Sequence, residues 1–287
     1  MDTLPPRLSI LRHDSDEASW EAVMGTPDPR LAGIVDGTYN GWTERTRTIR
    51  RRREVAKIII PVIINFGSRF GVLSEPGPLE RFDSFVAGLY DGPVLTEAEL
   101  TSHCLQVDFT PLGAHRLLGL PLHHLANRVV ELDAIFGPSF RRLTERLYEA
   151  DDWARRFNLL DRFLLSRIAR MPAADPRAVH ALRRLERSGG RLGIGRIAEE
   201  VDLERKQLIG LFHEQVGLPP KVLARLIRFD RAVQRLQAPG AALAEVAQDS
   251  GYYDQAHFNR DFRAFAGLSP TEFIRASLPE GGGLSGD

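Results

Sequence analysis

The last third of the chain contains one pattern twice, and this repeat restricts the fold more than any other feature of the sequence. The segment IAEEVDLERKQLIGLFHEQVGLPPKVL, residues 197–223, aligns with VAQDSGYYDQAHFNRDFRAFAGLSPTEF, residues 246–273. Ala198 matches Ala247 at an offset of 49 residues, whereas Gly217 matches Gly267 at an offset of 50. One residue has therefore been added in the turn of the second copy, and the shape of the unit is kept.

Each copy predicts a short helix with a buried alanine, a tight turn and a second helix. In the second copy, Asp254 is placed to cap the helix that follows the Gly251-Tyr252 turn. This arrangement is the helix-turn-helix of DNA-binding proteins, in which the second helix enters the major groove. One such match is weak evidence. Two copies joined by a single long helix, which a Pro-Gly pair ends at residues 239–240, are strong evidence.

The second helix of the second copy has two different sides. A rotation of about 100° per residue places Phe258, Phe262 and Phe265 in one narrow stripe, which we expect to face the core. The remaining polar side chains are candidates for DNA contacts: Gln255, His257, Asn259, Arg260 and Arg263. Arginine pairs well with guanine, and asparagine or glutamine with adenine. A solvated polar face is the simpler reading of one isolated helix, but the repeat favours DNA recognition.

The corresponding helix of the first copy is less well equipped to read bases. Gly210 stands where Arg260 stands in the second copy, and glycine has no side chain with which to read a base. The candidate DNA-binding residues of this helix are Arg205, Lys206, Gln207 and His213. We expect them to make phosphate or sparse base contacts. Base specificity should therefore depend mainly on the second copy.

These repeated segments resemble the AraC/XylS family of bacterial transcription regulators. The resemblance covers roughly Ala181 to Ala276, and its most specific parts are the Gly251-Tyr252 turn, the HFNRDF helix and the GLSPTEF close. It implies a seven-helix domain that lays both recognition helices into successive major grooves on one face of DNA. The recognition arginine of the family falls on Arg260. The family commonly has serine as the cap of the first recognition helix, where this chain has Glu204, a poorer cap.

The first half of the chain favours strands, so the predicted fold class is α+β. Val55 to Phe66 is rich in β-branched residues, Cys104 to Phe109 alternates, and Gly and Pro recur at close intervals. We expect a β-rich sandwich or barrel to about residue 115, resembling cupin-like sensor domains, and trailing helices from about residue 116. The predicted division is a sensor and dimerisation domain at 1–170, a linker at 171–176, an AraC-type DNA-binding domain at 177–278 and a disordered tail at 279–287.

One of the trailing helices is a candidate dimer interface. Its apolar residues recur at helical spacing, and Asp151 or Asp152 can cap it. They are Trp153, Phe157, Leu160, Leu164 and Ile168. Packing under the sheet and pairing with a second chain are equally good interpretations of this stripe.

Several residue types in the first half have ordinary interpretations. His103, His115, His123 and His124 lack a carboxylate at ligand-like spacing, so neither a metal site nor a cofactor is expected. Cys104, the only cysteine, is expected in the core. The basic run from Arg45 to Arg53 could line an anionic pocket or touch DNA. A solvated edge strand or hairpin is the favoured interpretation.

Composition sets the remaining limits. The formal net charge is +0, but His180 to Leu278 holds 15 Lys and Arg against 12 Asp and Glu. The N-terminus lacks a basic start followed by an apolar run. Pro61 interrupts the longest apolar run, which is far shorter than the roughly 20 residues of a membrane span. We therefore expect a cytoplasmic protein with no membrane partner.

Taken together, the sequence predicts a sequence-specific transcription regulator, either activator or repressor. Its expected partners are double-stranded promoter DNA, a small-molecule effector held by the N-terminal domain, a second copy in a homodimer, and RNA polymerase if it activates. The alternative is a ligand-sensing or protein-interaction module that has lost specific DNA binding. An enzyme is not expected, because the sequence has no Walker loop, dinucleotide fingerprint or nucleophile motif. Some DNA-repair alkyltransferases carry the same helical module, but they need a cluster of metal-held cysteines.

Overall fold

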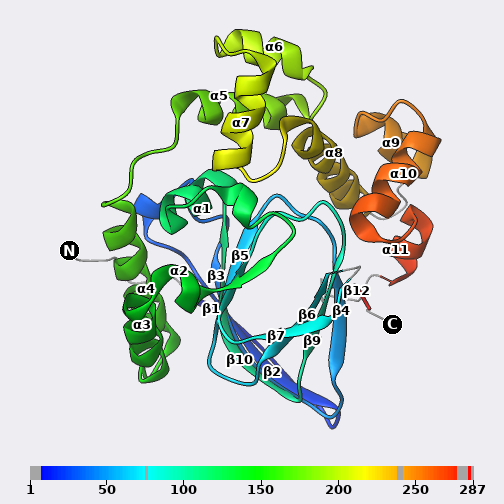
Figure 1. Ribbon diagram of the computed structural model, residues 1–287. Helices are drawn as coiled ribbons and strands as arrows, with labels where there is room; N and C mark the ends of the chain where they lie inside the picture. The colour runs from blue at the N-terminus through cyan, green and yellow to red at the C-terminus, as the bar shows by residue number, and fades with distance from the viewer. Residues whose placement is uncertain (1–7, 75–76, 238–241, 277–283, 286–287) are drawn as a thin grey trace.

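The computed structural model describes residues 8–74, 77–237, 242–276 and 284–285. Two β-sheets form most of the first half, and helices form the second half (Figure 1). The α+β class and the order of its parts are therefore as the sequence predicts. No helix in the described part of the chain is both long and apolar enough to cross a membrane.

The larger sheet has seven antiparallel strands in the order β1-β2-β3-β10-β5-β8-β11. Their bounds are β1 Leu8–Asp14, β2 Ala18–Gly25, β3 Tyr39–Thr46, β5 Ile60–Asn65, β8 Phe85–Ala87, β10 Thr101–Phe109 and β11 Val129–Glu131. At the centre, Cys104 of β10 lies opposite Trp42 on one side and Asn65 on the other.

The smaller sheet has five strands in the order β12-β4-β9-β6-β7. Their bounds are β4 Arg50–Glu54, β6 Phe70–Ser74, β7 Leu79–Phe82, β9 Val94–Ala98 and β12 Leu284–Ser285. Apolar side chains of both sheets meet between them, with Ile63, Phe85 and Cys104 from the larger sheet and Val72 from the smaller one. The first half is therefore a sandwich, as predicted, and Cys104 lies in its core.

Helices pack on the outer face of the larger sheet. They are η1 Pro29–Leu31, α1 Pro111–Leu118, η2 Leu122–His124, α2 Leu132–Phe136, α3 Pro138–Tyr148 and α4 Trp153–Ile168. The Asp152 carboxylate caps α4 by accepting a hydrogen bond from the Arg155 N–H at 2.7 Å. Gly41 of β3 allows the helix to approach closely, because a Cβ there would overlap the Trp153 ring. The same holds for Gly25 and the Phe157 ring.

Three short elements differ from the sequence predictions. Strand β11 interrupts the region expected to be helical, because Val129–Glu131 pairs with β8. Helix α1 begins at Pro111, within the part expected to be β-rich to about residue 115, because Thr110 caps it by accepting from the Gly113 N–H at 3.0 Å. The tail expected to be disordered contains β12, which pairs with β4. The Pro-Gly stop at 239–240 and the rest of the tail beyond 276 lie outside the described residues.

Seven helices form the described part of the second half, the number that the family resemblance implies. They are α5 Pro176–Ser188, α6 Ile194–Glu200, α7 Arg205–Gln215, α8 Pro220–Leu236, α9 Leu243–Asp249, α10 Gln255–Ala266 and α11 Pro270–Ala276. A non-helical stretch from Met171 to Asp175 separates α4 from α5, and it coincides with most of the predicted linker. Pro176 differs, since it is the first residue of α5.

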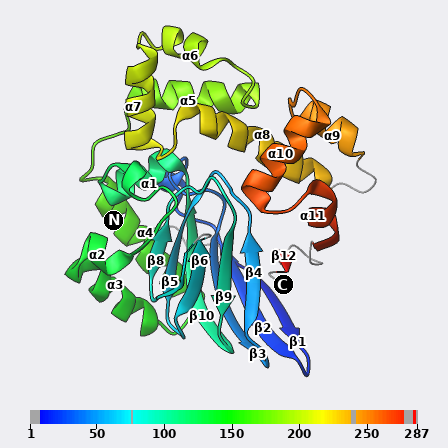
Figure 2. The same ribbon diagram turned by 45° about the vertical axis from the view of Figure 1, so that its right-hand side comes forward.

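The seven helices rest against one end of the sandwich (Figure 2). Helix α7 packs on η2 and α1 of the first half. The C-terminal end of α10 lies on the segment between β4 and β5. There the Ala56 N–H donates a hydrogen bond to the Phe265 carbonyl at 3.1 Å. Both halves of the repeat thus touch the N-terminal part of the chain.

Candidate nucleic-acid interface

The first helix-turn-helix consists of α6, a turn and α7. Ala198 of α6 is buried, as are Leu208 and Phe212 of α7. The turn contains Asp202 at a φ of 52°. Helix α7 then receives its cap from within, because the Gln207 side-chain oxygen accepts a hydrogen bond from the Glu204 N–H at 2.8 Å. This bond is one half of a capping box. The Gln207 side chain thus satisfies the backbone N–H of Glu204, the unusual cap residue.

The second helix-turn-helix consists of α9, a turn and α10. Gly251 has a φ of 88°, which favours glycine, and a Cβ there would crowd the Arg191 side chain. The next residue, Tyr252, is buried with its ring 5.1 Å from that of Phe258. Asp254 caps α10 as predicted, accepting from the His257 N–H at 2.6 Å. The sequence features of this turn therefore each have a structural role.

Helix α10 has the buried and exposed sides that its periodicity predicts. Phe258, Phe262 and Phe265 are fully buried, and the Phe229 ring of α8 lies 5.0 Å from Phe262 and 5.3 Å from Phe265. The apolar stripe is thus held by the long joining helix.

The polar candidates on α10 fall into two groups. Gln255, Arg260 and Arg263 are exposed to solvent. Asn259 is half-buried, and so is His257, whose Nε2 lies 3.7 Å from Asp261 Oδ2. Gln255, Arg260 and Arg263 are therefore accessible to a partner, while His257 lies against the buried Asp261 of the same helix.

The candidates on α7 divide in the same way. Arg205, Lys206 and Gln207 are exposed, as is Gly210, around which a Cβ would meet nothing within 4 Å. His213 is separate from them, because its ring is half-buried and lies 6.2 Å from the His123 ring of η2. His213 thus lies at the contact with the N-terminal part of the chain rather than with the exposed group.

Two arginines of α8 that the sequence analysis did not single out hold the second unit in place. Arg225 Nη2 donates to Asp261 Oδ1 at 2.9 Å, and its guanidinium lies over the Phe265 ring. Arg228 donates to the Gly190 carbonyl at 2.7 Å and lies 5.8 Å from the Tyr252 ring centre. Their i, i+3 spacing on one helix was the available signal. They connect α8 to the second helix-turn-helix and, through Gly190, to the turn that follows α5.

Tyr252 is buried between α10 and the Arg228 side chain of α8. Its hydroxyl is buried and has no hydrogen-bond partner among the described residues. Burial, together with the Asp261 carboxylate, raises the pKa of Tyr252 above its ordinary value. The tyrosine thus acts through packing, and its ring fixes the turn against α10.

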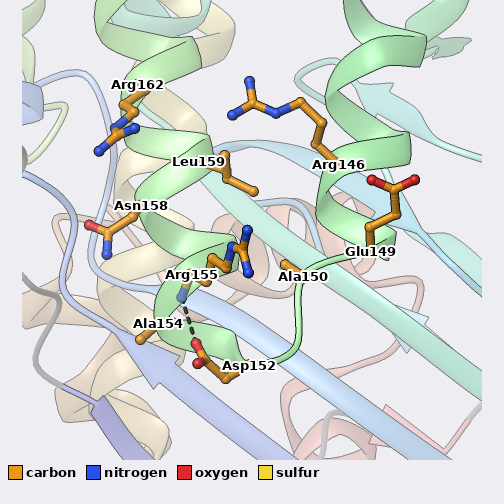
Figure 3. Close-up of a pocket in the computed structure, with 9 residues that line it drawn as sticks. All are labelled: Arg146, Glu149, Ala150, Asp152, Ala154, Arg155, Asn158, Leu159 and Arg162. Carbon is orange, nitrogen blue, oxygen red and sulfur yellow. Dashed lines mark hydrogen bonds between the residues drawn. The ribbon is translucent and has the colours of Figure 1, made fainter.

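The predicted dimerisation residues of α4 lie inside the molecule. Trp153, Phe157, Leu160, Leu164 and Ile168 are all buried, with at most 9% of each residue exposed. The outward side of α4 instead borders a polar hollow of about 450 Å³ shared with α3, lined by Arg155, Asn158 and Arg162 of α4 and by Arg146 of α3 (Figure 3). Packing under the sheet is therefore the arrangement of this stripe in the structure, and it does not form a surface for a second chain.

Between the two sheets lies a cavity of about 220 Å³ that is partly open to solvent. Its wall combines apolar and aromatic side chains with charged ones from β3 and β4. Ala56, the residue that bonds to α10, also lines it. A single residue, Ala56, therefore contacts both the cavity and the second helix-turn-helix.

His103 packs against aromatic side chains of the first half. The His103 ring lies 5.1 Å from Phe66 and 5.8 Å from Trp153. Burial, followed by the charge of Arg156, lowers its pKa. In the described ranges, no three His, Cys, Asp or Glu side chains are grouped so that they could hold a metal ion.

Two helix-turn-helix units on one connecting helix, each with an exposed polar face on its second helix, define a tandem helix-turn-helix domain. A family profile described as "Helix-turn-helix domain" matches residues 197–276. The C-terminal part of this chain is a helix-turn-helix domain of the AraC/XylS type, as its sequence resemblance predicts.

Curated relatives agree with this family. The Msm operon regulatory protein of Streptococcus mutans is 26% identical over 117 residues, which cover 40% of this chain and 42% of that protein. The arabinose operon regulatory protein of Escherichia coli is 29% identical over 130 residues, covering 43% of this chain and 44% of that protein. The chain thus spans less than half the length of each of these two relatives.

Solved structures with some likeness include ToxT from Vibrio cholerae, which is 10% identical with a TM-score of 0.46. That match covers 79% of this chain and 96% of ToxT. An AraC-type regulator from Chromobacterium violaceum is 27% identical with a TM-score of 0.34, over 37% of this chain and 96% of that one.

Proposed function

We propose that this chain is a sequence-specific DNA-binding transcription regulator whose activity is controlled by a small molecule in the N-terminal sandwich. One observation carries the proposal: both second helices of the repeat, α7 and α10, present exposed polar and cationic side chains while their apolar sides are buried. Arg260 and Arg263 of α10 are suited to guanine or phosphate, and Gln255 is suited to adenine. Arg205 and Lys206 of α7 supply phosphate contacts, and Gln207 is held by its capping bond.

The cavity in the sandwich supports control by an effector. Ala56 lines the cavity and also donates its N–H to the Phe265 carbonyl in α10. A ligand that shifts the segment around Ala56 would therefore act on the second recognition helix. In this proposal the N-terminal part is a regulatory domain and not an enzyme. A homodimer and a contact with RNA polymerase are further parts of the proposal, on surfaces other than the buried stripe of α4.

Selection of bound fragments from random DNA tests the proposal. The purified chain should enrich a defined sequence, and its affinity for that sequence should fall steeply with salt, because each neutralised phosphate releases counterions. Recovery of unenriched DNA at every salt concentration would contradict it. That result would instead favour a module that has lost specific DNA binding, an alternative to which the exposed Gly210 and Ile209 on α7 give some support.

A further inference from the structure

The arginine run of β4 alternates between two environments. Arg51 points away from the sandwich interior, and its Nε donates to Glu97 Oε2 at 3.0 Å. Arg50 and Arg52 lie on the opposite face of the strand and line the cavity. The sequence favoured a solvated edge strand for this run. The structure differs, because the period of two in a strand turns alternate arginines inward.

One buried carboxylate lies between the two inward arginines. Glu44 Oε1 is 3.5 Å from Arg50 Nη1 and 3.6 Å from Arg52 Nη2, and Glu44 is 8% exposed. These separations exceed the usual 2.7–3.2 Å of a hydrogen bond. Within the described residues, neither guanidinium donates a hydrogen bond to Glu44. The side chains of Arg50 and Arg52 are 41% and 38% exposed, so each arginine keeps donors available at the cavity wall for another acceptor.

The charges that line the cavity do not cancel. Three cationic side chains, Arg50, Arg52 and Lys57, face two carboxylates, Glu44 and Glu54, which leaves one positive charge in excess. A monoanion would neutralise this excess, whereas a cation would increase it. Arginine is also the side chain whose donor geometry best matches a carboxylate.

The rest of the wall is apolar and aromatic. The Trp42 and Phe70 rings meet edge to face at 6.4 Å, and Phe70 meets Phe85 in the same way at 6.2 Å. Ile63 and Val72 lie beside them. The volume of about 220 Å³ is below the roughly 300–1,000 Å³ usual for pockets that hold drug-sized ligands. This volume and wall favour a small occupant with an apolar body.

We propose that the cavity binds a small monocarboxylate with an aromatic or aliphatic body, its carboxylate bound between Arg50 and Arg52 beside Glu44. The inference rests on the proposed role of the sandwich as the effector-binding part of a regulator, and it names the chemical class of that effector. The aromatic rings surround the body of the ligand, and Glu44 sets the affinity by competing for the two guanidinium groups.

Thermal unfolding and calorimetry of the full chain with matched acids and amides test this inference. The probes are benzoate, phenylacetate and hexanoate, each compared with its neutral amide. We expect at least one acid to bind saturably and raise the melting temperature, and its amide to bind at least about tenfold more weakly, because charge-assisted hydrogen bonds to the arginines are lost.

Three variants and one matched control assign the binding to the cavity. Arg50→Gln and Arg52→Gln should each weaken acid binding at least about tenfold, whereas the matched control Arg51→Gln, on the outer face of the same strand, should not. Glu44→Gln should strengthen acid binding, because the competing carboxylate is removed. This gain of affinity cannot result from misfolding.

The inference is overturned if no acid of the panel binds, if each amide binds as tightly as its acid, or if Glu44→Gln weakens binding of the acid. DNA selection with the same preparation separates the two proposals. Specific DNA binding without acid binding would overturn only the ligand class. Acid binding without specific DNA binding would support the ligand class and contradict the proposed regulator.

Discussion

At the scale of single residues, Arg260 is the side chain on which base recognition should depend most. It is exposed on α10, and its neighbours Phe258 and Phe262 hold the helix in the core. Arg260→Ala should leave folding unchanged and remove roughly 1–3 kcal/mol of preference for the selected DNA over random DNA. Competition binding measures this preference, with Arg142→Ala on α3 as a control for loss of one exposed arginine. An unchanged preference in Arg260→Ala would assign base reading to another residue.

Asp161 is a second residue with a defined energetic role. Its Oδ1 accepts hydrogen bonds from the Tyr39 hydroxyl at 2.7 Å and from the Asp28 N–H at 3.0 Å, which ties α4 to the sandwich. Asp161→Leu leaves both buried donors unsatisfied and should lower the free energy of unfolding by about 2 kcal/mol or more. Asp161→Asn retains an acceptor oxygen and should be much less harmful. Urea denaturation compares the two variants.

The same carboxyl group predicts a pH dependence. Burial raises the pKa of Asp161 above its ordinary 3.8, so the folded state binds this proton more tightly than the unfolded state. The contribution to stability is present below the ordinary pKa and is lost as pH rises through the raised pKa. The stability of Asp161→Asn relative to the parent chain should therefore increase as pH rises from about 4. A difference that stays constant with pH would show that Asp161 does not titrate in this way.

At the scale of elements, α7 contains a glycine whose replacement should help folding. Gly210 lies within the helix, and a Cβ would meet nothing there. Gly210→Ala should raise the free energy of unfolding by about 0.5–1 kcal/mol. Gly190→Ala is the contrasting variant, because Gly190 has a φ of 69° and its Cβ would collide with the Ala224 carbonyl. Thermal unfolding should show opposite signs, and destabilisation by Gly210→Ala would mean that α7 is strained at this site.

The elements that were predicted and those that were not differ in what determines them. The periodic phenylalanines and the Asp254 cap are local signals, so α10 and its exposed face followed from sequence. Strands β11 and β12 exist through pairing with β8 and β4, which are distant in sequence and leave no local pattern. The run at Arg50–Arg53 is four consecutive arginines, so its sequence shows no alternation, and only the facing Glu44 and the cavity identify which side is internal. The sequence could not show that His213 lies against η2, because this contact joins residues that are distant along the chain.

At the scale of the whole molecule, the repeat and the sandwich form one connected structure. Helix α7 contacts η2, α10 contacts the segment at Ala56, and β12 pairs with β4 (Figures 1 and 2). The exposed sides of α7 and α10 remain uncovered in this arrangement. Because the formal net charge is +0, attraction to DNA must come from these local faces and not from the charge of the whole chain.

Chemical footprinting on the selected DNA tests most directly whether both repeats bind. Two protected segments, separated by about one helical turn of roughly 10 bp and lying on one face of the duplex, are the expected result. Arg260→Ala should weaken one of them selectively. A single protected segment that Arg260→Ala abolishes entirely would show that α7 does not contact DNA, and no protected segment would contradict DNA recognition by the tandem domain.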